Sequence, residues 1–249
     1  MKLGFCFLVK EGLSHCSLWE SFFASVSPDA YGVYVHAKTS APHPVLVGSR
    51  VDPAPIKTAW GDRSLVAATQ RLFSMAIDDD CDSMVLLSGD TLPLQSFSWI
   101  QEFCAQTRLS VQPQVGLSER QVKANVQRFS LLAAYLRLPL DELKKQNMFF
   151  SMRRDDFLKI VAKSDISGFP LRELADEYYW INYLICIGAK WQSSKVVFCN
   201  PDPTKTQALV MDLTSELLRS CFSNGYAFIR KVAGIDSEAM RDLRRIYSV

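Results

Sequence analysis

Leu3-Gly-Phe-Cys-Phe-Leu-Val9 is the stretch that decides the fold of this 249-residue chain. An unbroken apolar run with two aromatic residues is typical of a strand that is buried on both faces of a sheet. Strands of this kind belong to parallel sheets, whose crossover connections cover both faces with helices. The opening run therefore predicts an α/β protein.

The first 90 residues alternate between strand and helix patterns. Residues 13–24 and 64–77 carry apolar side chains at helical spacing, and Asp62 is placed to cap the second helix. Residues 31–36 and 83–87 are apolar enough to form two more buried strands. This order predicts a Rossmann-like half within a mixed, mostly parallel sheet that is flanked by helices.

The rest of the chain follows a less regular pattern. Prolines between residues 41 and 55 predict a loop, with a short extended piece at 45–47. A possible capping box at 118–121 marks the start of one helix. Helices are predicted at 97–107, 118–138, 139–141, 155–162, 173–187, 213–221 and 237–247, and strands at 148–152, 195–199 and 226–232.

Composition and charge exclude several classes of protein. The chain is 48% hydrophobic and 22% charged, and 28 basic residues against 26 acidic ones leave a net charge of +2. This balance gives no overall field for nucleic acid or a membrane surface, although local clusters such as Lys144-Lys145 could serve anionic ligands. No stretch approaches the roughly 18 apolar residues of a membrane span.

Cysteine usage indicates a reducing compartment. Seven dispersed cysteines without C-x-x-C spacing, together with only three histidines, argue against a zinc site and against a disulfide scaffold. The N-terminal apolar run is short and is followed by Lys10, which is unlike a signal peptide. We therefore expect a soluble, cytoplasmic protein.

The commonest catalytic and phosphate-binding motifs are missing from the sequence. It contains no G-x-G-x-x-G, no Walker sequence and no G-x-S-x-G elbow, and its three histidines all lie within the first 43 residues. A ligand site in this chain must therefore be formed by residues outside these motifs.

Ser88-Gly89-Asp90 follows a predicted buried strand directly. Ligands bind beyond the carboxyl ends of strands in open α/β sheets. Gly89 would let the backbone approach a ligand, and Asp90 could accept hydrogen bonds from a sugar or coordinate a cation. The alternative is an ordinary turn before Pro93. The acidic run at 78–80 is more typical of a solvated helix end.

Asp176-Glu177 runs straight into the aromatic residues Tyr178, Tyr179 and Trp180. Apolar walls around a carboxyl group raise its pKa towards the range that suits a general base. The alternative is the start of an amphipathic helix, with both acids in solvent.

Basic residues stand near predicted strand and loop ends in the C-terminal part of the chain. Lys205, Arg230 and Lys231 could neutralise a leaving diphosphate. Each of them alone is more typical of a surface charge.

Seven short segments stand in a characteristic order along about 230 residues. They are LWESFF (18–23), YVH (34–36), WGDRSLVAA (60–68), VLLSGDTLPL (85–94), FFSMRR (149–154), ADEYYW (175–180) and YAFIRKV (226–232). In this order they resemble the core-2/I-branching β-1,6-N-acetylglucosaminyltransferase family and its peptide O-xylosyltransferase relatives. The resemblance implies a GT-A-type fold, a nucleotide-sugar donor, inversion at the anomeric carbon and no divalent metal.

The resemblance also implies roles for individual residues. Glu177 matches the family's general base, and Lys231 matches a lysine that holds the diphosphate. Lys205 falls near the second basic position, although its spacing to Lys231 differs. Asp90 lies one place earlier than the aspartate of many relatives. We expect donor binding by His36, Lys38, Arg63, Ser88, Gly89, Asp90, Lys205, Arg230 and Lys231, and a pocket wall of Asp176, Tyr178 and Trp180.

The resulting hypothesis is a single glycosyltransferase domain over residues 1–249. Residues 1–95 would bind a nucleotide sugar, a UDP-sugar of the GlcNAc or xylose class, and residues 96–249 would hold the carbohydrate acceptor and the base. Two rivals stay open at this point. One is a catalytically silent carbohydrate- or nucleotide-binding protein of the same fold, and the other is a metal-dependent glycosyltransferase that uses the acidic run at 78–82.

Overall fold

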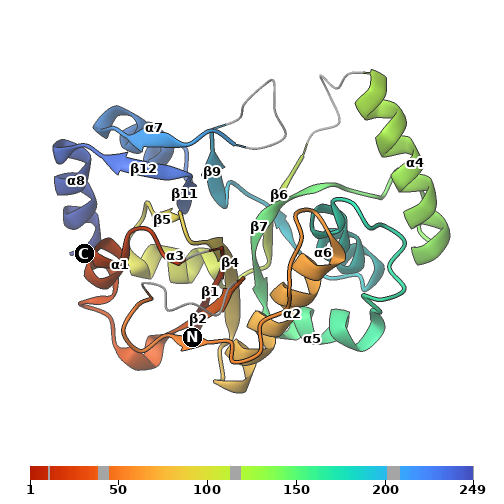
Figure 1. The fold of residues 1–249 in the computed structure, drawn as a ribbon, viewed down its shortest axis with the longest axis horizontal. Coiled ribbons are helices and arrows are strands. Elements are labelled where there is room, and N and C mark those ends of the chain that lie inside the picture. The colour runs from red at the N-terminus through yellow and green to blue at the C-terminus, as the bar shows by residue number, and fades with distance from the viewer. Residues whose placement is uncertain (11, 39–44, 113–118, 201–207, 249) are drawn as a thin grey trace.

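The computed structural model describes residues 1–10, 12–38, 45–112, 119–200 and 208–248 (Figure 1). Its elements, in chain order, are β1 (Leu3–Val9), α1 (Cys16–Phe23), the 3₁₀-helix η1 (Pro28–Ala30), β2 (Tyr31–Ala37), β3 (Arg50–Val51), α2 (Arg63–Asp78), β4 (Ser83–Ser88), β5 (Leu92–Pro93), α3 (Phe97–Cys104), β6 (Arg108–Val111), α4 (Glu119–Leu136), β7 (Gln146–Arg153), α5 (Arg154–Lys163), α6 (Ala175–Cys186), β8 (Gln192–Ser193), β9 (Val197–Cys199), β10 (Met211–Leu213), α7 (Ser215–Ser223), β11 (Phe228–Arg230), β12 (Val232–Ile235) and α8 (Ser237–Tyr247).

The largest sheet has its strands in the order β3-β2-β1-β4-β7-β6-β8. Strand β1 pairs in parallel with β2 on one side and with β4 on the other, so that Phe5 lies level with Val33 and Val85. Strand β7 is antiparallel to both β4 and β6. The run β3-β2-β1-β4 is the order of a Rossmann half. The predicted mixed, mostly parallel sheet is therefore confirmed, and β1, β2 and β4 end at one edge.

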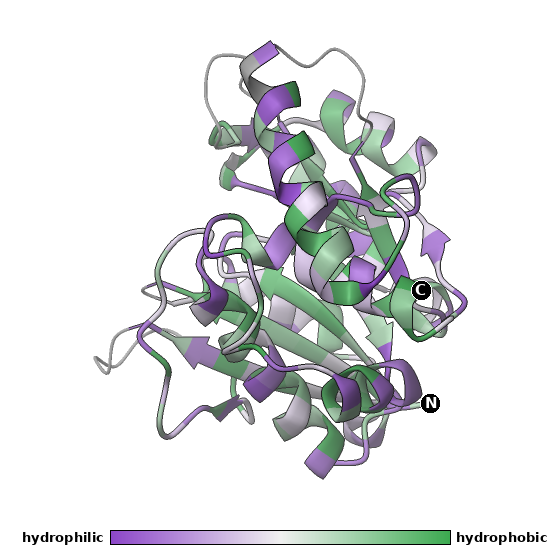
Figure 2. Ribbon diagram, turned by 90° about the vertical axis from the view of Figure 1, so that its right-hand side faces the viewer, coloured by the Kyte–Doolittle hydropathy of each residue, from purple (hydrophilic) through white to green (hydrophobic). Residues whose placement is uncertain are grey.

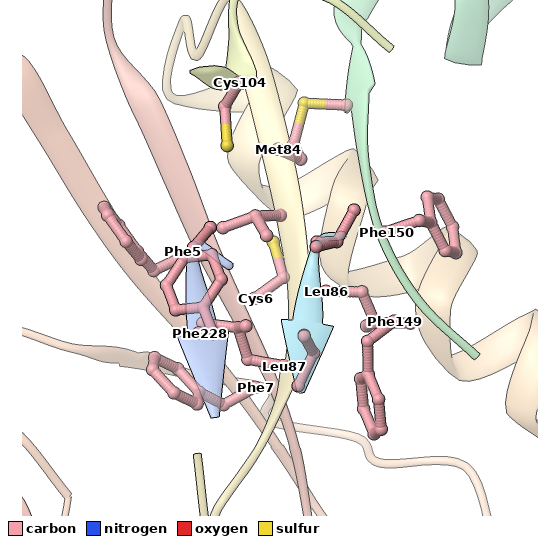
Figure 3. Packing of buried hydrophobic residues seen from close by; sticks show 14 of the residues in the cluster. Phe5, Cys6, Phe7, Met84, Leu86, Leu87, Cys104, Phe149, Phe150 and Phe228 are labelled. Atoms are coloured by element: carbon pink, nitrogen blue, oxygen red, sulfur yellow. The ribbon is translucent and has the colours of Figure 1, made fainter. Parts of the chain in front are cut away.

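The apolar run of β1 is buried on both faces, as its composition predicts. The rings of Phe5 and Phe7 contact Trp19 of α1, with centroid separations of 5.8 and 5.1 Å. On the opposite face, the Cys6 thiol donates to the carbonyl of Leu72 in α2 over 3.8 Å. Figure 3 shows the packing of these strand residues, and Figure 2 shows the central strands as hydrophobic.

Aromatic contacts hold α6 against the sheet. Phe73 of α2 lies 5.7 Å from Phe150 of β7, 5.6 Å from Phe157 of α5 and 6.1 Å from Trp180 of α6, measured between ring centroids. Edge and tilted ring contacts at these separations are favourable. The N-terminal turn of α6 is thereby fixed relative to the edge where β1, β2 and β4 end.

The C-terminal elements return the chain to that edge. Strand β11 pairs with β5 and β9 in a small sheet, and β12 pairs with β10. The amide of Val232 donates to the carbonyl of Asp90 over 3.3 Å, and the Tyr247 hydroxyl donates to the carbonyl of Pro93 over 2.8 Å. These bonds place Arg230 and Lys231 beside the end of β4.

Most predicted elements are present, and the differences have physical reasons. The helix predicted at 97–107 ends at Cys104, because the chain soon enters β6, a four-residue strand that is too short to show a period. The helical turn predicted at 139–141 is a non-helical turn, and the extended piece predicted at 45–47 is replaced by β3. The strand predicted at 226–232 is divided into β11 and β12 at Lys231.

Some predictions fall partly outside the described residues. The first residue of the predicted capping box, Ser118, and much of the loop at 200–205 lie there. The Asp62 cap is confirmed, since its carboxylate accepts a hydrogen bond from the amide of Ser64 over 2.8 Å. None of the described helices combines the length and apolar character of a membrane span.

Candidate active site

A cavity of about 360 Å³ opens at the carboxyl ends of β1, β2 and β4. This is the edge of an open α/β sheet at which ligands bind, where the strand order reverses between β1 and β4. The residues that line the cavity come from both halves of the chain. They are Leu8, Val9, Lys10, His36, Lys38, Thr58, Ala59, Trp60, Gly61, Leu65, Ser88, Met148, Phe149, Leu174, Asp176, Glu177, Ala208, Arg230 and Lys231.

His36 supplies a fixed, neutral part of the wall. The side chain stands at the end of β2 in a residue that is 1% exposed, and its Nε2 accepts a hydrogen bond from the amide of Ile56 over 2.8 Å. Burial lowers the pKa of His36 below its ordinary value. The imidazole therefore contributes polarity and shape to the cavity without positive charge at neutral pH.

Arg230 is held in place from two sides. Its Nε donates to Asp90 Oδ1 over 3.3 Å, and its guanidinium carbon lies 4.5 Å from the centre of the Phe149 ring. Asp90 is itself fixed, because the Ser88 hydroxyl donates to the same oxygen over 2.5 Å. A guanidinium oriented by an ion pair and an aromatic face is suited to bind phosphate oxygens. Lys231, the next residue, also lines the cavity.

Two carboxyl groups face the cavity from the first turn of α6. A helix N-terminus favours negative charge nearby. Glu177 has a side chain that is 20% exposed, and its Oε2 lies 2.9 Å from the Nζ of Lys145. That contact is an ion pair rather than an aligned hydrogen bond. Glu177 is thus a charged group at the cavity wall, opposite in sign to Arg230 and Lys231.

Asp176 is the more deeply buried of the two carboxyl groups. The residue is 7% exposed, and within the described residues its Oδ1 has no hydrogen-bond partner. Burial raises the pKa of Asp176 to about 7, and the charge of Glu177 adds to the rise, whereas Lys145 acts against it. A carboxyl group of this kind is near the point of ionisation at neutral pH.

The WGDR segment positions the first turn of α6. The carbonyl of Gly61 accepts a hydrogen bond from the amide of Ala175 over 2.9 Å. Gly61 has a φ of +67°, and a Cβ there would lie 3.2 Å from the amide nitrogen of Leu174, so a side chain would strain this contact. Trp60 stays 64% exposed at the cavity wall, where its ring offers a flat apolar surface.

Some of the predicted site residues do not line the cavity. Arg63 faces away, and its guanidinium donates to the backbone carbonyls of Ser167 and, over 3.1 Å, Phe169. Its position corrects the expected donor contact to a link between the start of α2 and the connection between α5 and α6. Gly89 also has another reason for being glycine, since a Cβ there would lie 2.1 Å from the carbonyl oxygen of Gly12. The close approach is made by the protein's own backbone.

The aromatic residues after Glu177 belong to the core rather than to the cavity wall. Tyr178 and Trp180 are 0% and 1% exposed. The Tyr178 hydroxyl donates to Asn125 Oδ1 over 2.9 Å. Only residues of the first turn of α6 reach the cavity, because the residues that follow are packed in the core, and this corrects the expected pocket wall. Asp90 likewise acts through Arg230 in this structure, and Lys205 lies outside the described residues.

The acidic run at 78–82 lies at the opposite edge of the sheet, before β4 begins. Asp79 pairs with Arg50 and accepts a hydrogen bond from the Tyr34 hydroxyl over 3.0 Å, and Asp80 lies 3.3 Å from Arg154. This placement corrects the rival hypothesis in which the run serves the donor site. Among the residues that the structure describes, no cluster of three His, Cys, Asp or Glu side chains could hold a metal ion.

Sequence reasoning missed several residues at or beside the cavity, and three of them are notable. Lys10 and Trp60 line it, and Lys145 contacts Glu177 from behind. Trp60 carried a signal, because it opens the WGDRSLVAA segment of the family resemblance. Lys145 was marked only as part of a basic cluster, and its contact with Glu177 could not be predicted, since that partner stands 32 positions later in the chain.

The family model described as "Core-2/I-Branching enzyme" matches residues 3–194, a span that contains Ser88, Asp176 and Glu177 and ends before Arg230. No curated protein sequence matches the chain.

Two solved structures are similar to the chain in outline. One is the galactosyltransferase LgtC in complex with donor and acceptor sugar analogues, at 13% identity and a TM-score of 0.46, covering 100% of this chain and 95% of that one. The other is a mannose-1-phosphate geranyltransferase from Thermus thermophilus, at 10% identity and a TM-score of 0.34, covering 72% and 71%. Neither likeness assigns a substrate. On the match over residues 3–194, the chain belongs to the Core-2/I-branching enzyme family of glycosyltransferases.

Proposed function

We propose that this glycosyltransferase moves a sugar of the GlcNAc or xylose class from a UDP-sugar to a hydroxyl group of a carbohydrate or glycoconjugate, with inversion and without a metal ion. The observation that carries the proposal is the charge arrangement of one cavity. Carboxyl groups of α6 and the cations Arg230 and Lys231 line the same cavity at the end of the Rossmann half. The reaction needs a base and a site for a diphosphate, and the cavity offers candidates for both.

In the proposed step, the acceptor oxygen forms a bond to the anomeric carbon while the bond from that carbon to the diphosphate oxygen breaks. The acceptor proton passes to Glu177, which becomes a neutral acid. The leaving diphosphate keeps the bonding electron pair, and Arg230 and Lys231 stabilise its new charge. Because attack and departure occur on opposite faces of the sugar, the configuration inverts.

The assignment of the base to Glu177 rests on two features. Its side chain is more exposed to the cavity than that of Asp176, and Lys145 balances its charge at 2.9 Å. Asp176 is the alternative base, since its pKa of about 7 also suits proton transfer. The variants Glu177→Gln and Asp176→Asn distinguish the two candidate bases. Loss of transfer in Asp176→Asn alone would assign the base to Asp176.

The test is a thermal-shift screen of nucleotide sugars, in manganese and in chelator, followed by analysis of the product. We expect a UDP-sugar to raise the melting temperature equally in both buffers, since a bound ligand stabilises the fold in proportion to the logarithm of its concentration over Kd. NMR of the product should show a β-linkage from an α-linked donor. A retained α-linkage, or stabilisation only with manganese, would contradict the proposed mechanism.

The rival of a silent binding protein makes a different prediction in the same screen. It expects stabilisation by a nucleotide sugar with neither transfer to an acceptor nor release of UDP.

We also propose that the enzyme works in the cytoplasm, which is supported by its seven free cysteines. Cell fractionation tests that placement.

A further inference from the structure

Lys145 contacts the proposed base from outside the cavity wall. Its Nζ lies 2.9 Å from Glu177 Oε2, and the two side chains are 18% and 20% exposed. Within the described part of the chain, Lys145 is the one basic residue at ion-pair distance from Glu177. A partly buried pair is screened by solvent and salt less than a surface pair is, so its charges interact more strongly.

The backbone beside Lys145 is fastened to the helix that carries Glu177. Asn182 of α6 is fully buried, and its Oδ1 accepts a hydrogen bond from the amide of Lys144 over 2.9 Å. Its Nδ2 donates to the carbonyl of the same residue, also over 2.9 Å. This two-way contact keeps the segment before β7 in register with α6. The backbone from which the Lys145 side chain reaches Glu177 is therefore fixed relative to α6.

The surroundings of Glu177 explain why a cation is needed beside its carboxylate. The buried Asp176 carboxyl is its neighbour in the same turn of helix, and ionising both groups would place two negative charges side by side. The cavity is also lined by the cations Lys10, Lys38, Arg230 and Lys231. Arg230 is paired with Asp90, and a donor diphosphate would engage Arg230 and Lys231, so that Lys145 is the cation that serves Glu177.

We propose that Lys145 is a positioning residue for the general base. It holds Oε2 of Glu177 so that Oε1 is the oxygen presented to the acceptor hydroxyl, and it keeps the carboxylate charged beside Asp176. This inference rests on the proposed function, because it takes Glu177 as the base. The lysine itself exchanges no proton in the step: the acceptor proton still passes to Glu177.

The test compares Lys145→Met and Lys145→Arg with Lys144→Met as the matched control. Within the described part of the chain, the Lys144 ammonium donates a hydrogen bond to the carbonyl of Asp141 over 3.1 Å and has no ion pair with Glu177. The rate of UDP release from UDP-GlcNAc and from UDP-xylose is measured against pH, with water as acceptor. In Lys145→Met we expect a lower kcat, an unchanged donor KM and an acidic limb moved up by about one to three pH units. Lys145→Arg should restore the limb, and Lys144→Met should match wild type.

An acidic limb that stays in place in Lys145→Met, or that moves equally in Lys144→Met, would overturn the inference. A second measurement separates this failure from failure of the proposed function. Thermal unfolding of Lys145→Met, Glu177→Gln and the double variant forms a double-mutant cycle that needs no substrate. We expect the double variant to lose less stability than the two single losses together, and strictly additive losses would refute the pairing. Absence of UDP release by wild type would instead count against the proposed function.

Discussion

Replacing Asp176 by Asn should make the protein more stable at high pH, and the gain in stability should grow as the pH rises. The residue is 7% exposed, and its pKa is raised from 3.8 to about 7 by burial and by the charge of Glu177. Since one pKa unit corresponds to about 1.4 kcal/mol, the ionised carboxylate costs the folded state on the order of 4 kcal/mol. Asparagine has nearly the same shape and carries no charge.

The sign follows from where the protons bind. Between the unfolded pKa of 3.8 and the folded pKa of about 7, the native state holds a proton that the unfolded state has lost. The contribution of Asp176 to stability is therefore complete below about pH 4 and is lost as the pH rises through 7. Asp176→Asn lacks this loss, so the stability difference between variant and wild type should grow by about 2–3 kcal/mol from about pH 5 to about pH 8.

Urea unfolding of both proteins at the two pH values measures this difference, and other titrating groups cancel between them. Glu177→Gln is the matched control, because removing the neighbouring charge should lower the pKa of Asp176 and flatten the pH dependence. Parallel stability curves for wild type and Asp176→Asn would refute the account of Asp176 as a buried, readily neutralised carboxyl group.

Three further predictions concern the cavity and its frame. Arg230→Ala should weaken donor binding at least about tenfold in calorimetric titration, since it removes a charge-assisted contact to the diphosphate. Asp90→Asn should weaken donor binding less, because it only frees the guanidinium of Arg230. Equal donor affinity in wild type and both variants would contradict the site. Gly89→Ala should lower the free energy of unfolding by about 1–3 kcal/mol, because its Cβ would lie 2.1 Å from the carbonyl of Gly12; an unchanged urea midpoint would show that the contact is not tight. Trp60→Ala should change the free energy of unfolding by less than about 0.5 kcal/mol, since the ring is 64% exposed. The same variant should raise the KM of the donor or of the acceptor. A large fall in melting temperature would place the ring in the core instead.

The sequence carried enough information to predict the fold, because that depends on local patterns. The apolar run Leu3–Val9 and the charged helix Ser237–Tyr247 match their predicted bounds. Strand β6 was missed, since four residues show no period and their pairing with β7 and β8 is a tertiary contact. Long, regular elements were therefore easier to predict than short ones.

The candidate site was predictable only where a motif marks it. Ser88 and Glu177 stand at the cavity as their motifs predict. Arg63 and Trp180 lie in equally distinctive motifs, but a motif residue can also belong to the frame that holds the site. Arg63 links the start of α2 to the connection between α5 and α6, and Trp180 fills the core. Lys145 could not be found from sequence, because its role is set by a contact between distant segments.

The central claim is that Glu177 accepts the proton of the acceptor hydroxyl. The most direct test compares wild type and Glu177→Gln for donor binding and for sugar transfer at neutral pH, with the UDP-sugar that the thermal-shift screen selects. Glutamine keeps the shape of the side chain and cannot act as the base. We expect the donor to stabilise both proteins equally, while transfer falls by about 10²–10⁴-fold in the variant. Transfer at the wild-type rate by Glu177→Gln would contradict the account.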